Sequence, residues 1–188
     1  MEYKVYKLTF PNGLHVGRGS LSTSDMIVHS DTLFSALCIE ALAIGGREKL
    51  DKLVGYARSG QLIISDAMPY VGNTMYIPKP MCRIVRTDTD QALKKAFKKL
   101  SYIPWKMLDE YLSGKTDPET INDGFKRLGK HMQFKKVYVK EGEDNEPYNV
   151  GAFRFGENNG LYLIAGYETE ESDMFMAELM ESLQYSGL

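Results

Sequence analysis

FPNGLHVGRGS at residues 10–20, followed by HSDTLFSAL at residues 29–37, decides how the start of this chain folds. Residues 2–10 alternate between apolar and polar side chains, which predicts a half-buried strand. Pro11, Asn12 and Gly13 break that strand. A helix that is apolar on most sides is predicted from residue 30 to residue 44, with Ser30 or Asp31 as its cap. A glycine-rich basic turn therefore lies between a strand and a helix N-terminus.

This arrangement suggests a surface that binds phosphate. Glycine lets the backbone come close to a ligand, and a helix N-terminus offers unpaired N–H groups to an anion. The segment contains neither GxxxxGK[ST] nor a full GxGxxG, so nucleotide hydrolysis is not supported.

The bulk composition is that of a soluble globular protein with one ordinary domain or two small ones. The 188 residues are 43% apolar and 26% charged. No apolar run approaches the roughly 20 residues that span a bilayer, and the N-terminus reads as a strand rather than a signal peptide. Cys38 and Cys82 are too few for a metal site or a disulfide framework. We expect a cytoplasmic protein with no membrane partner and no cofactor.

Charge is strongly segregated along the chain. Residues 1–78 carry 7 basic and 7 acidic side chains, residues 79–140 carry 15 and 7, and residues 141–188 carry 1 and 11. Such segregation predicts a basic face for nucleic acid and an acidic face for another partner. The alternative for the basic segment is an ordinary solvated helix surface.

The first half of the chain predicts strand, helix, strand, strand, which is the front of a ferredoxin-like βαββαβ unit. Gly45 and Gly46 end the apolar helix, and a short helix follows at 47–58. Strands are predicted at 61–66 and 75–77, with a turn at 69–74 between them.

The second half predicts further helices and a long hairpin. A helix with a lysine-rich face is expected at 90–112, ended or kinked by Pro104, and another at 118–127. Strands at 134–140 and 148–155 form the hairpin, and a strand follows at 161–167. The acidic helix at 169–185 is expected to expose Met174 or Met176, since methionine suits an adaptable protein interface.

Histidine and aspartate side chains are the candidates for acid–base catalysis and for metal binding. His15 and His29 could serve a metal-free ribonuclease as base and acid, or could be surface residues that contact RNA without chemistry. Asp31, with Asp25 and Asp66, shows no spacing that supports a metal cluster, and Asp31 is better explained at the helix start.

The predicted hairpin combines aromatic and basic side chains, as single-stranded RNA binding requires. Strand alternation also turns some of the aromatic rings towards the core. The residues concerned are Lys135, Lys136, Tyr138, Tyr148, Phe153 and Arg154.

The blocks at 13–20, 29–37, 65–70 (SDAMPY) and 77–80 (IPKP) together resemble the RAMP (repeat-associated) superfamily. Within it the chain is similar to the fourth subunit of the Csm complex, the type III-A CRISPR effector, from residue 1 to its end. Family members usually continue past a segment like 183–188 into a glycine-rich basic loop, so a truncated form is expected.

The resemblance implies an α+β, ferredoxin-like (RRM-like) RAMP fold, with one complete unit and the start of a second. Residues 1–130 would form an N-terminal ferredoxin-like domain with a basic helical insertion. Residues 131–188 would form a thumb-like β-hairpin and the first part of a second, incomplete ferredoxin-like domain.

The resemblance also implies a non-catalytic scaffold with no metal site. It would grip the 5′ repeat-derived handle of the CRISPR RNA and join the large polymerase-like subunit to the backbone RAMP subunit. Its hairpin would meet target RNA indirectly, by wedging into the guide–target duplex. The expected RNA-binding residues are His15, Gly17, Arg18, Gly19, Ser20, His29, Ser30, Lys79, Arg83, Lys135, Lys136 and Arg154.

Two alternatives stay open. One is a metal-independent endoribonuclease of the same superfamily that processes CRISPR RNA with His15 or His29. The other is a general single-stranded RNA-binding module, although the chain lacks a recognisable RNP motif.

Overall fold

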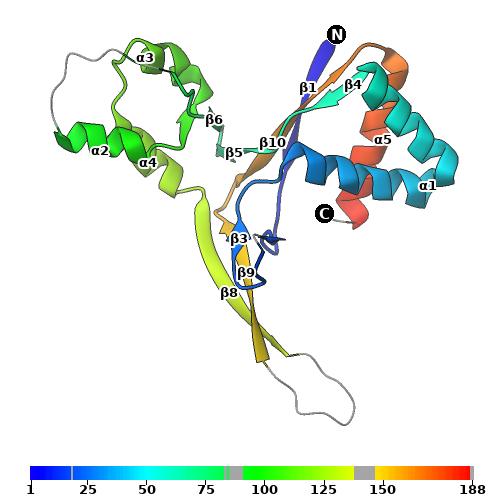
Figure 1. Cartoon of the computed structure of the whole chain (residues 1–188), viewed down its shortest axis with the longest axis horizontal. Coiled ribbons are helices and arrows are strands. Elements are labelled where there is room, and N and C mark those ends of the chain that lie inside the picture. The colour runs from blue at the N-terminus through cyan, green and yellow to red at the C-terminus, as the bar shows by residue number, and fades with distance from the viewer. Residues whose placement is uncertain (18, 83, 85–90, 138–146, 187–188) are drawn as a thin grey trace. The chain divides into compact units, whose positions relative to one another are not determined.

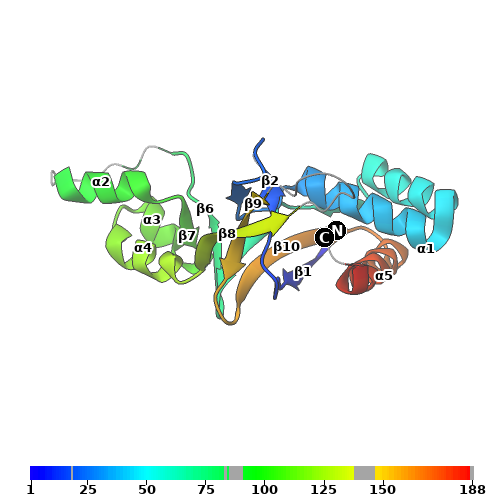
Figure 2. The same cartoon turned by 90° about the horizontal axis from the view of Figure 1, so that it is seen from below.

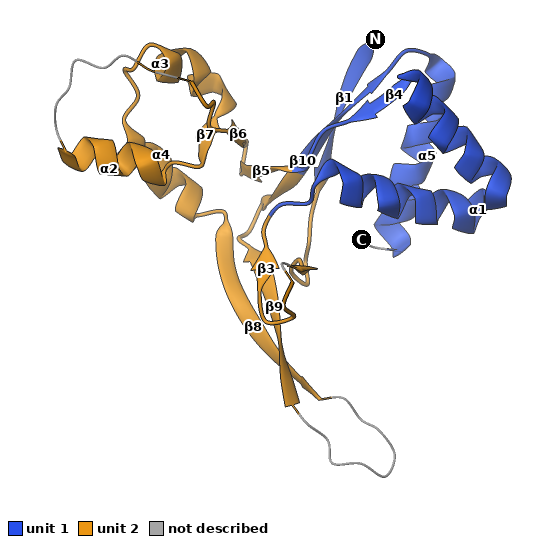
Figure 3. Cartoon of the chain, viewed as in Figure 1, with its two compact units in different colours: residues 1–7, 27–67, 162–188 blue, residues 8–26, 68–161 orange. Residues whose placement is uncertain are grey.

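The computed structural model describes residues 1–186 apart from 18, 83, 85–90 and 138–146. The chain mixes helices with antiparallel strand pairs (Figure 1). It divides into unit 1, which is Met1–Lys7, Ile27–Ala67 and Tyr162–Leu188, and unit 2, which is Leu8–Met26 and Met68–Leu161 (Figure 3). These units are discontinuous in sequence, whereas the division at residue 130 expected above is continuous. That division into 1–130 and 131–188 stays a prediction.

Unit 1 places two helices beside three strands. Strand β10 pairs antiparallel with β4, with Ala165 opposite Ile64, and it also pairs with β1. The two helices pack side by side (Figure 2) and bury apolar side chains such as Leu37 and Leu179. Its elements are β1 (Glu2–Leu8), α1 (Ser30–Ser59), β4 (Leu62–Ile64), β10 (Asn159–Tyr167) and α5 (Glu170–Ser186).

Helix α1 contains the break that the sequence predicts at its glycine pair. Gly46 has φ 63° and ψ −158°, which is not helical, and separates the two helical segments. Gly60 ends the helix in the left-handed conformation, with φ 76°. Neither α1 nor any other helix in the described part of the chain combines the length and apolarity needed to cross a membrane.

The acidic helix α5 is partly neutralised inside unit 1. Lys4 Nζ lies 2.5 Å from Asp173 Oδ2, and Lys52 Nζ lies 2.6 Å from Glu171 Oε1. Met174 is 67% exposed, but Met176 is fully buried. The expectation that Met176 could serve an interface is therefore wrong, because its side chain belongs to the core.

Unit 2 contains a small lobe and a hairpin. The lobe has β5 and β6 paired antiparallel, then β7 paired with β6, around a core of Tyr76, Leu100, Ile103, Tyr111 and Ile121. The elements of unit 2 are β2 (Val16–Gly17), β3 (Ser24–Asp25), β5 (Met68–Val71), β6 (Thr74–Pro78), α2 (Gln91–Lys99), β7 (Tyr102–Pro104), the 3₁₀ turn η1 (Trp105–Met107), α3 (Leu108–Leu112), α4 (Pro118–Lys126), β8 (Gly129–Val137) and β9 (Pro147–Phe155).

The single helix expected at 90–112 is wrong. Strand β7 interrupts it, with Ile103 opposite Ile77 of β6 and fully buried. The strand stops at Pro104, which cannot donate a backbone hydrogen bond inside a helix. Burial of Ile103 in the lobe core overrides the local helix preference.

We predict opposite effects of the same substitution at two glycines of α1. Gly46→Ala should destabilise the chain by about 1–3 kcal/mol, because its backbone conformation is essentially restricted to glycine. Gly55→Ala, in the helical part of α1, should stabilise it by about 0.4–1 kcal/mol. Neither added Cβ meets an atom within 4 Å, so the comparison isolates the backbone. Urea unfolding of both variants measures the effect, and equal stabilisation would mean that α1 is unbroken.

Candidate nucleic-acid interface

The glycine-rich segment of the sequence is held on one edge of β9. Leu14 N donates to Phe153 O at 2.8 Å, and Phe153 N donates to Leu14 O at 2.7 Å. Gly151 N donates to Leu21 O at 2.7 Å. Both ends of the 14–21 segment are therefore fixed by backbone bonds to a strand whose other edge pairs with β8.

His15 is oriented by the same strand. Its Nδ1 lies 2.5 Å from Gly151 O. Because a carbonyl oxygen only accepts, Nδ1 carries the hydrogen and Nε2 is the acceptor of the neutral ring. The side chain is exposed. His15 therefore offers Nε2 to a ligand: as an acceptor when the ring is neutral, and as a donor to phosphate when it is protonated.

The turn between β2 and β3 has a fixed base and an exposed tip. Ser24 Oγ accepts from Val16 N at 3.0 Å and donates to Leu14 O at 3.1 Å. Gly19 has φ 79°, in the left-handed region that favours glycine. The expected residues Gly19 and Ser20 are exposed in the turn, Gly17 is exposed at the end of β2 opposite Ser24, and Arg18 lies outside the described residues.

The hairpin of β8 and β9 places two cations directly opposite each other. Lys130 pairs with Arg154 in the strand register, and both are exposed. Like charges directly opposite on a strand pair repel. Neither side chain makes an ion pair with any described residue. This pair is a candidate site for a phosphate group.

The alternation of β8 separates two lysines that the sequence places together. Lys136, opposite Tyr148, shares a face with Lys130 and Arg154, whereas Lys135 lies on the other face. Phe134 and Tyr148, each 38% exposed, lie on the first face, where bases can stack on their rings.

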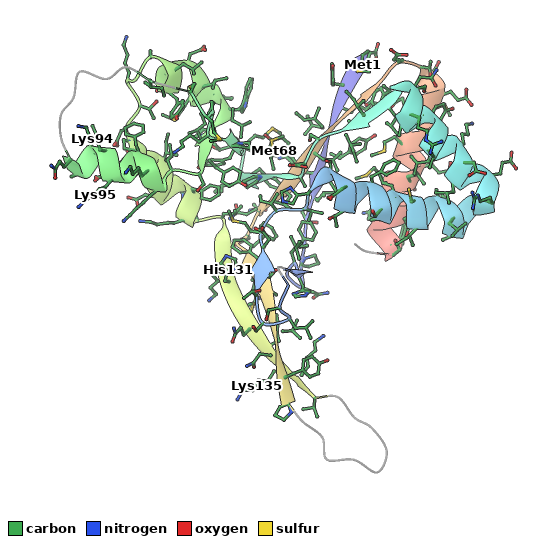
Figure 4. All side chains as sticks on the ribbon, viewed as in Figure 1. Met1, Met68, Lys94, Lys95, His131 and Lys135 are labelled. Carbon is green, nitrogen blue, oxygen red and sulfur yellow. The ribbon has the colours of Figure 1, made fainter. Side chains whose placement is uncertain are left out.

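The second face of the hairpin is partly covered by the glycine-rich segment. Gln133 Nε2 donates to Ser22 O at 3.1 Å. Phe153 is 4% exposed and makes an edge-to-face contact with His131, so it is a core residue. Figure 4 shows His131 and Lys135 along β8.

The side chain of Lys79 is hydrogen-bonded within the small lobe. Its Nζ donates to Phe97 O at 3.0 Å, near the end of α2. With Lys98, Phe97 and Tyr111 it lines a pocket of about 240 Å³. Arg83 lies outside the described residues.

In unit 1, His29 and Ser30 form hydrogen bonds with the carboxylate of Asp66. His29 is the N-cap of α1, and Asp66, just after β4, accepts from Ser30 N at 2.7 Å and from His29 Nδ1 at 3.2 Å. The expected cap by Ser30 or Asp31 is wrong, because the Asp66 side chain supplies the acceptor. Asp31 instead accepts from Thr32 N at 2.6 Å.

These carboxylates change the electrostatics of the helix start. The hydrogen bond from Ser30 N–H lowers the pKa of Asp66 most. Burial raises this pKa and the His29 ring lowers it further, so that the net effect is a lowered pKa. A negative charge therefore occupies the positive end of the α1 dipole at neutral pH. The N-terminus of α1 is less open to an external anion than the sequence predicts. His29 is exposed there, and its Nε2 takes no part in the bond to Asp66.

The histidines form no assembled acid–base pair inside either unit. His15 belongs to unit 2 and His29 to unit 1, and each is held through Nδ1 by its own acceptor. Among the described residues, no three His, Cys, Asp or Glu side chains gather as metal ligands do. Cooperation of His15 and His29 in catalysis stays a prediction.

The sequence did not predict two hairpin residues of unit 2, Lys130 and Gln133, or the capping role of Asp66 in unit 1. The sequence predicts a strand that begins at residue 134 and so excludes Lys130, whereas β8 begins at Gly129. Asp66 was present in the SDAMPY block, but its partner lies 36 residues earlier, and no local signal reports such a distance.

Comparison with known proteins identifies the family, although no family model matches. The chain is 36% identical over 172 residues to the CRISPR system Cms protein Csm4 of Mycobacterium tuberculosis (strain H37Rv), covering 90% of this chain and 55% of the relative. It is 33% identical over 196 residues to Csm4 of Streptococcus thermophilus, covering 100% and 60%. The chain belongs to the Csm4 family. It spans a little over half the length of these Csm4 relatives.

Solved Csm4 assemblies have a similar fold. A crystal structure of a Csm1–Csm4 cassette in complex with cA4 matches with a TM-score of 0.61 and 26% identity, over 97% of this chain and 65% of that one. A Csm3–Csm4 subcomplex of the type III-A CRISPR-Cas interference complex matches with a TM-score of 0.58 and 20% identity, over 86% of this chain and 60% of that one, and so supports the fold alone.

Removal of the Asp66 side chain should weaken the start of α1. We expect Asp66→Ala to cost about 1 kcal/mol, as loss of a helix cap does, and to lower Tm by about 2–4 °C. Asp66→Asn is the control, because its amide oxygen can still accept from Ser30 N.

The cost of Asp66→Ala should depend on pH. Because the pKa of Asp66 is lowered from its ordinary value of 3.8, the stabilisation is complete above that value and is lost as the pH falls through the lower folded-state pKa. Thermal unfolding from pH 7 to pH 2 should therefore show the wild type and Asp66→Ala converging only in acid. A constant difference over the whole range would mean that the charge of Asp66 contributes nothing.

Proposed function

We propose that this chain is the RNA-gripping portion of a type III-A CRISPR effector subunit. It binds the 5′ repeat-derived handle of the CRISPR RNA and does not catalyse a reaction. The observation that carries the proposal is the glycine-rich segment fixed on β9, next to a hairpin that opposes Lys130 and Arg154 without an acidic partner in the described chain.

The chemistry of this surface suits an RNA backbone. The exposed glycines of the 14–21 segment, Gly17 in β2 and Gly19 in the turn, let phosphates approach the main chain. His15 offers Nε2 to a base edge, a 2′-hydroxyl or a phosphate. The hairpin adds cations and two half-exposed rings, Phe134 and Tyr148, which together are the usual components of single-strand binding.

The order of elements in unit 1 supports a ferredoxin-like RAMP fold. The chain order β1, α1, β4, β10, α5 with the strand order β1–β10–β4 equals the first five elements of a βαββαβ unit. In this interpretation, most of unit 2 is an insertion between the second and third strands, and the β8–β9 hairpin is the thumb.

The partners that we propose are inferred from solved structures of related proteins. Proteins of this family occur in structures with Csm1 and with Csm3. By this likeness, we propose that the chain joins a large polymerase-like subunit to a backbone RAMP subunit, in the cytoplasm, and meets target RNA indirectly through its hairpin.

A binding assay with two RNAs tests the proposal. Fluorescence anisotropy should show at least about tenfold tighter binding (1.4 kcal/mol) of the chain to its repeat-derived handle than to a scrambled RNA of equal length. Equal affinity for both would favour the general binding module. Cleavage of repeat RNA at one position in the presence of a chelator would favour the processing enzyme.

Arg154→Gln should weaken RNA binding and increase the stability of the free chain. It should weaken handle binding several-fold, because a phosphate contact is lost. It should also stabilise the free chain by about 0.2–1 kcal/mol, because repulsion by Lys130 is relieved. Lys115→Gln removes an equal charge from an exposed position between α3 and α4 and should change neither property comparably. A loss of stability with unchanged affinity would contradict the assignment.

A further inference from the structure

Helix α2 presents four lysines on one side. Lys94 and Lys98 form one row along the helix, and Lys95 and Lys99 form the next, since residues four apart lie on the same face. All four are exposed, whereas Leu93, Ala96 and Phe97 are half-buried on the opposite side. Figure 4 shows Lys94 and Lys95 on α2.

This lysine face of α2 has no acidic counterpart in the described part of the chain. The helix contains no acidic residue, and none of the four lysines makes an ion pair with a described residue. Like charges four residues apart destabilise a helix, so the helix relies on packing of Phe97 against the lobe core. An anionic partner would relieve this repulsion.

The surroundings of the lysine face favour RNA over an acidic protein. Lys98 also lines the 240 Å³ pocket, with Lys79 at its side and the half-buried ring of Phe97 in its wall, whereas Tyr111 belongs to the lobe core. Lysines beside aromatic rings are what single-stranded nucleic acid needs, because phosphates meet the cations and a base stacks on a ring. An acidic protein surface would use the lysines but not the ring of Phe97.

We propose that the lysine face of α2 is a second RNA-binding surface, which contacts the phosphate backbone of single-stranded RNA beyond the 5′ handle. This inference rests on the proposed function, since it assumes that the handle is bound elsewhere on the chain. The strand concerned is either the guide part of the CRISPR RNA or the target RNA, and the experiment distinguishes them.

The test compares salt dependence for three RNAs: the handle alone, the handle extended by guide sequence, and a target strand alone. Lys94→Gln/Lys98→Gln should leave the affinity for the handle alone unchanged. One of the two longer RNAs should bind to α2. For that RNA, the slope of the logarithm of the association constant against log [salt] should fall in magnitude by about 1.4, since each phosphate contact to a single strand contributes about 0.7. Glutamine is a good helix former, so α2 should persist, which circular dichroism checks.

Lys106→Gln/Lys115→Gln is the matched control, with the same charge change in the same unit, and it should leave the slopes nearly unchanged. Lys95→Gln/Lys99→Gln should repeat the effect of the first pair. An unchanged slope for both longer strands in both α2 variants would overturn the inference, even where the wild type still prefers the handle. Absence of handle preference in the wild type would instead overturn the proposed function.

Discussion

The backbone of β9 between Gly151 and Phe153 is the constraint on which the candidate interface depends. One edge of this strand pairs with β8, and the other holds the 14–21 segment through Leu14 and Leu21. Glycine is required at position 151, because a Cβ there would lie 2.5 Å from Ser22 O. This close approach lets the Gly151 carbonyl orient the ring of His15. The two ends of the glycine-rich segment are thereby fixed on one strand.

The two units differ in how many of their charged side chains form ion pairs, which explains how a net charge of −2 is compatible with the proposed RNA-binding surface. In unit 1, lysines of β1 and α1 pair with the acidic side chains of α5. In the described part of unit 2, the cations of α2 and the hairpin have no such partners. Local charge, rather than the net charge, therefore determines where an anionic polymer can bind.

Local patterns in the sequence predicted the elements that local physics determines. Alternation predicts the first strand, the two runs on either side of a polar turn predict the described hairpin from residue 134 onward, and the glycine pair predicts the break in α1. Residues 138–140, Tyr138 among them, were part of the strand prediction and lie outside the described residues. Three features depend on residues far apart and were missed: burial of Ile103 against β6, capping of α1 by Asp66, and the register that opposes Lys130 to Arg154. The site residues could be named from the resemblance, but the face on which each lies required the register.

Cross-linking between the chain and the handle tests the assigned surface most directly. The complex would be assembled on CRISPR RNA carrying 4-thiouridine in the handle, irradiated, digested and analysed by mass spectrometry. We expect handle cross-links in the peptides that contain residues 10–26 and the β8–β9 hairpin. Cross-links confined to α5 and the 47–59 part of α1, with none in the glycine-rich segment, would contradict the assignment.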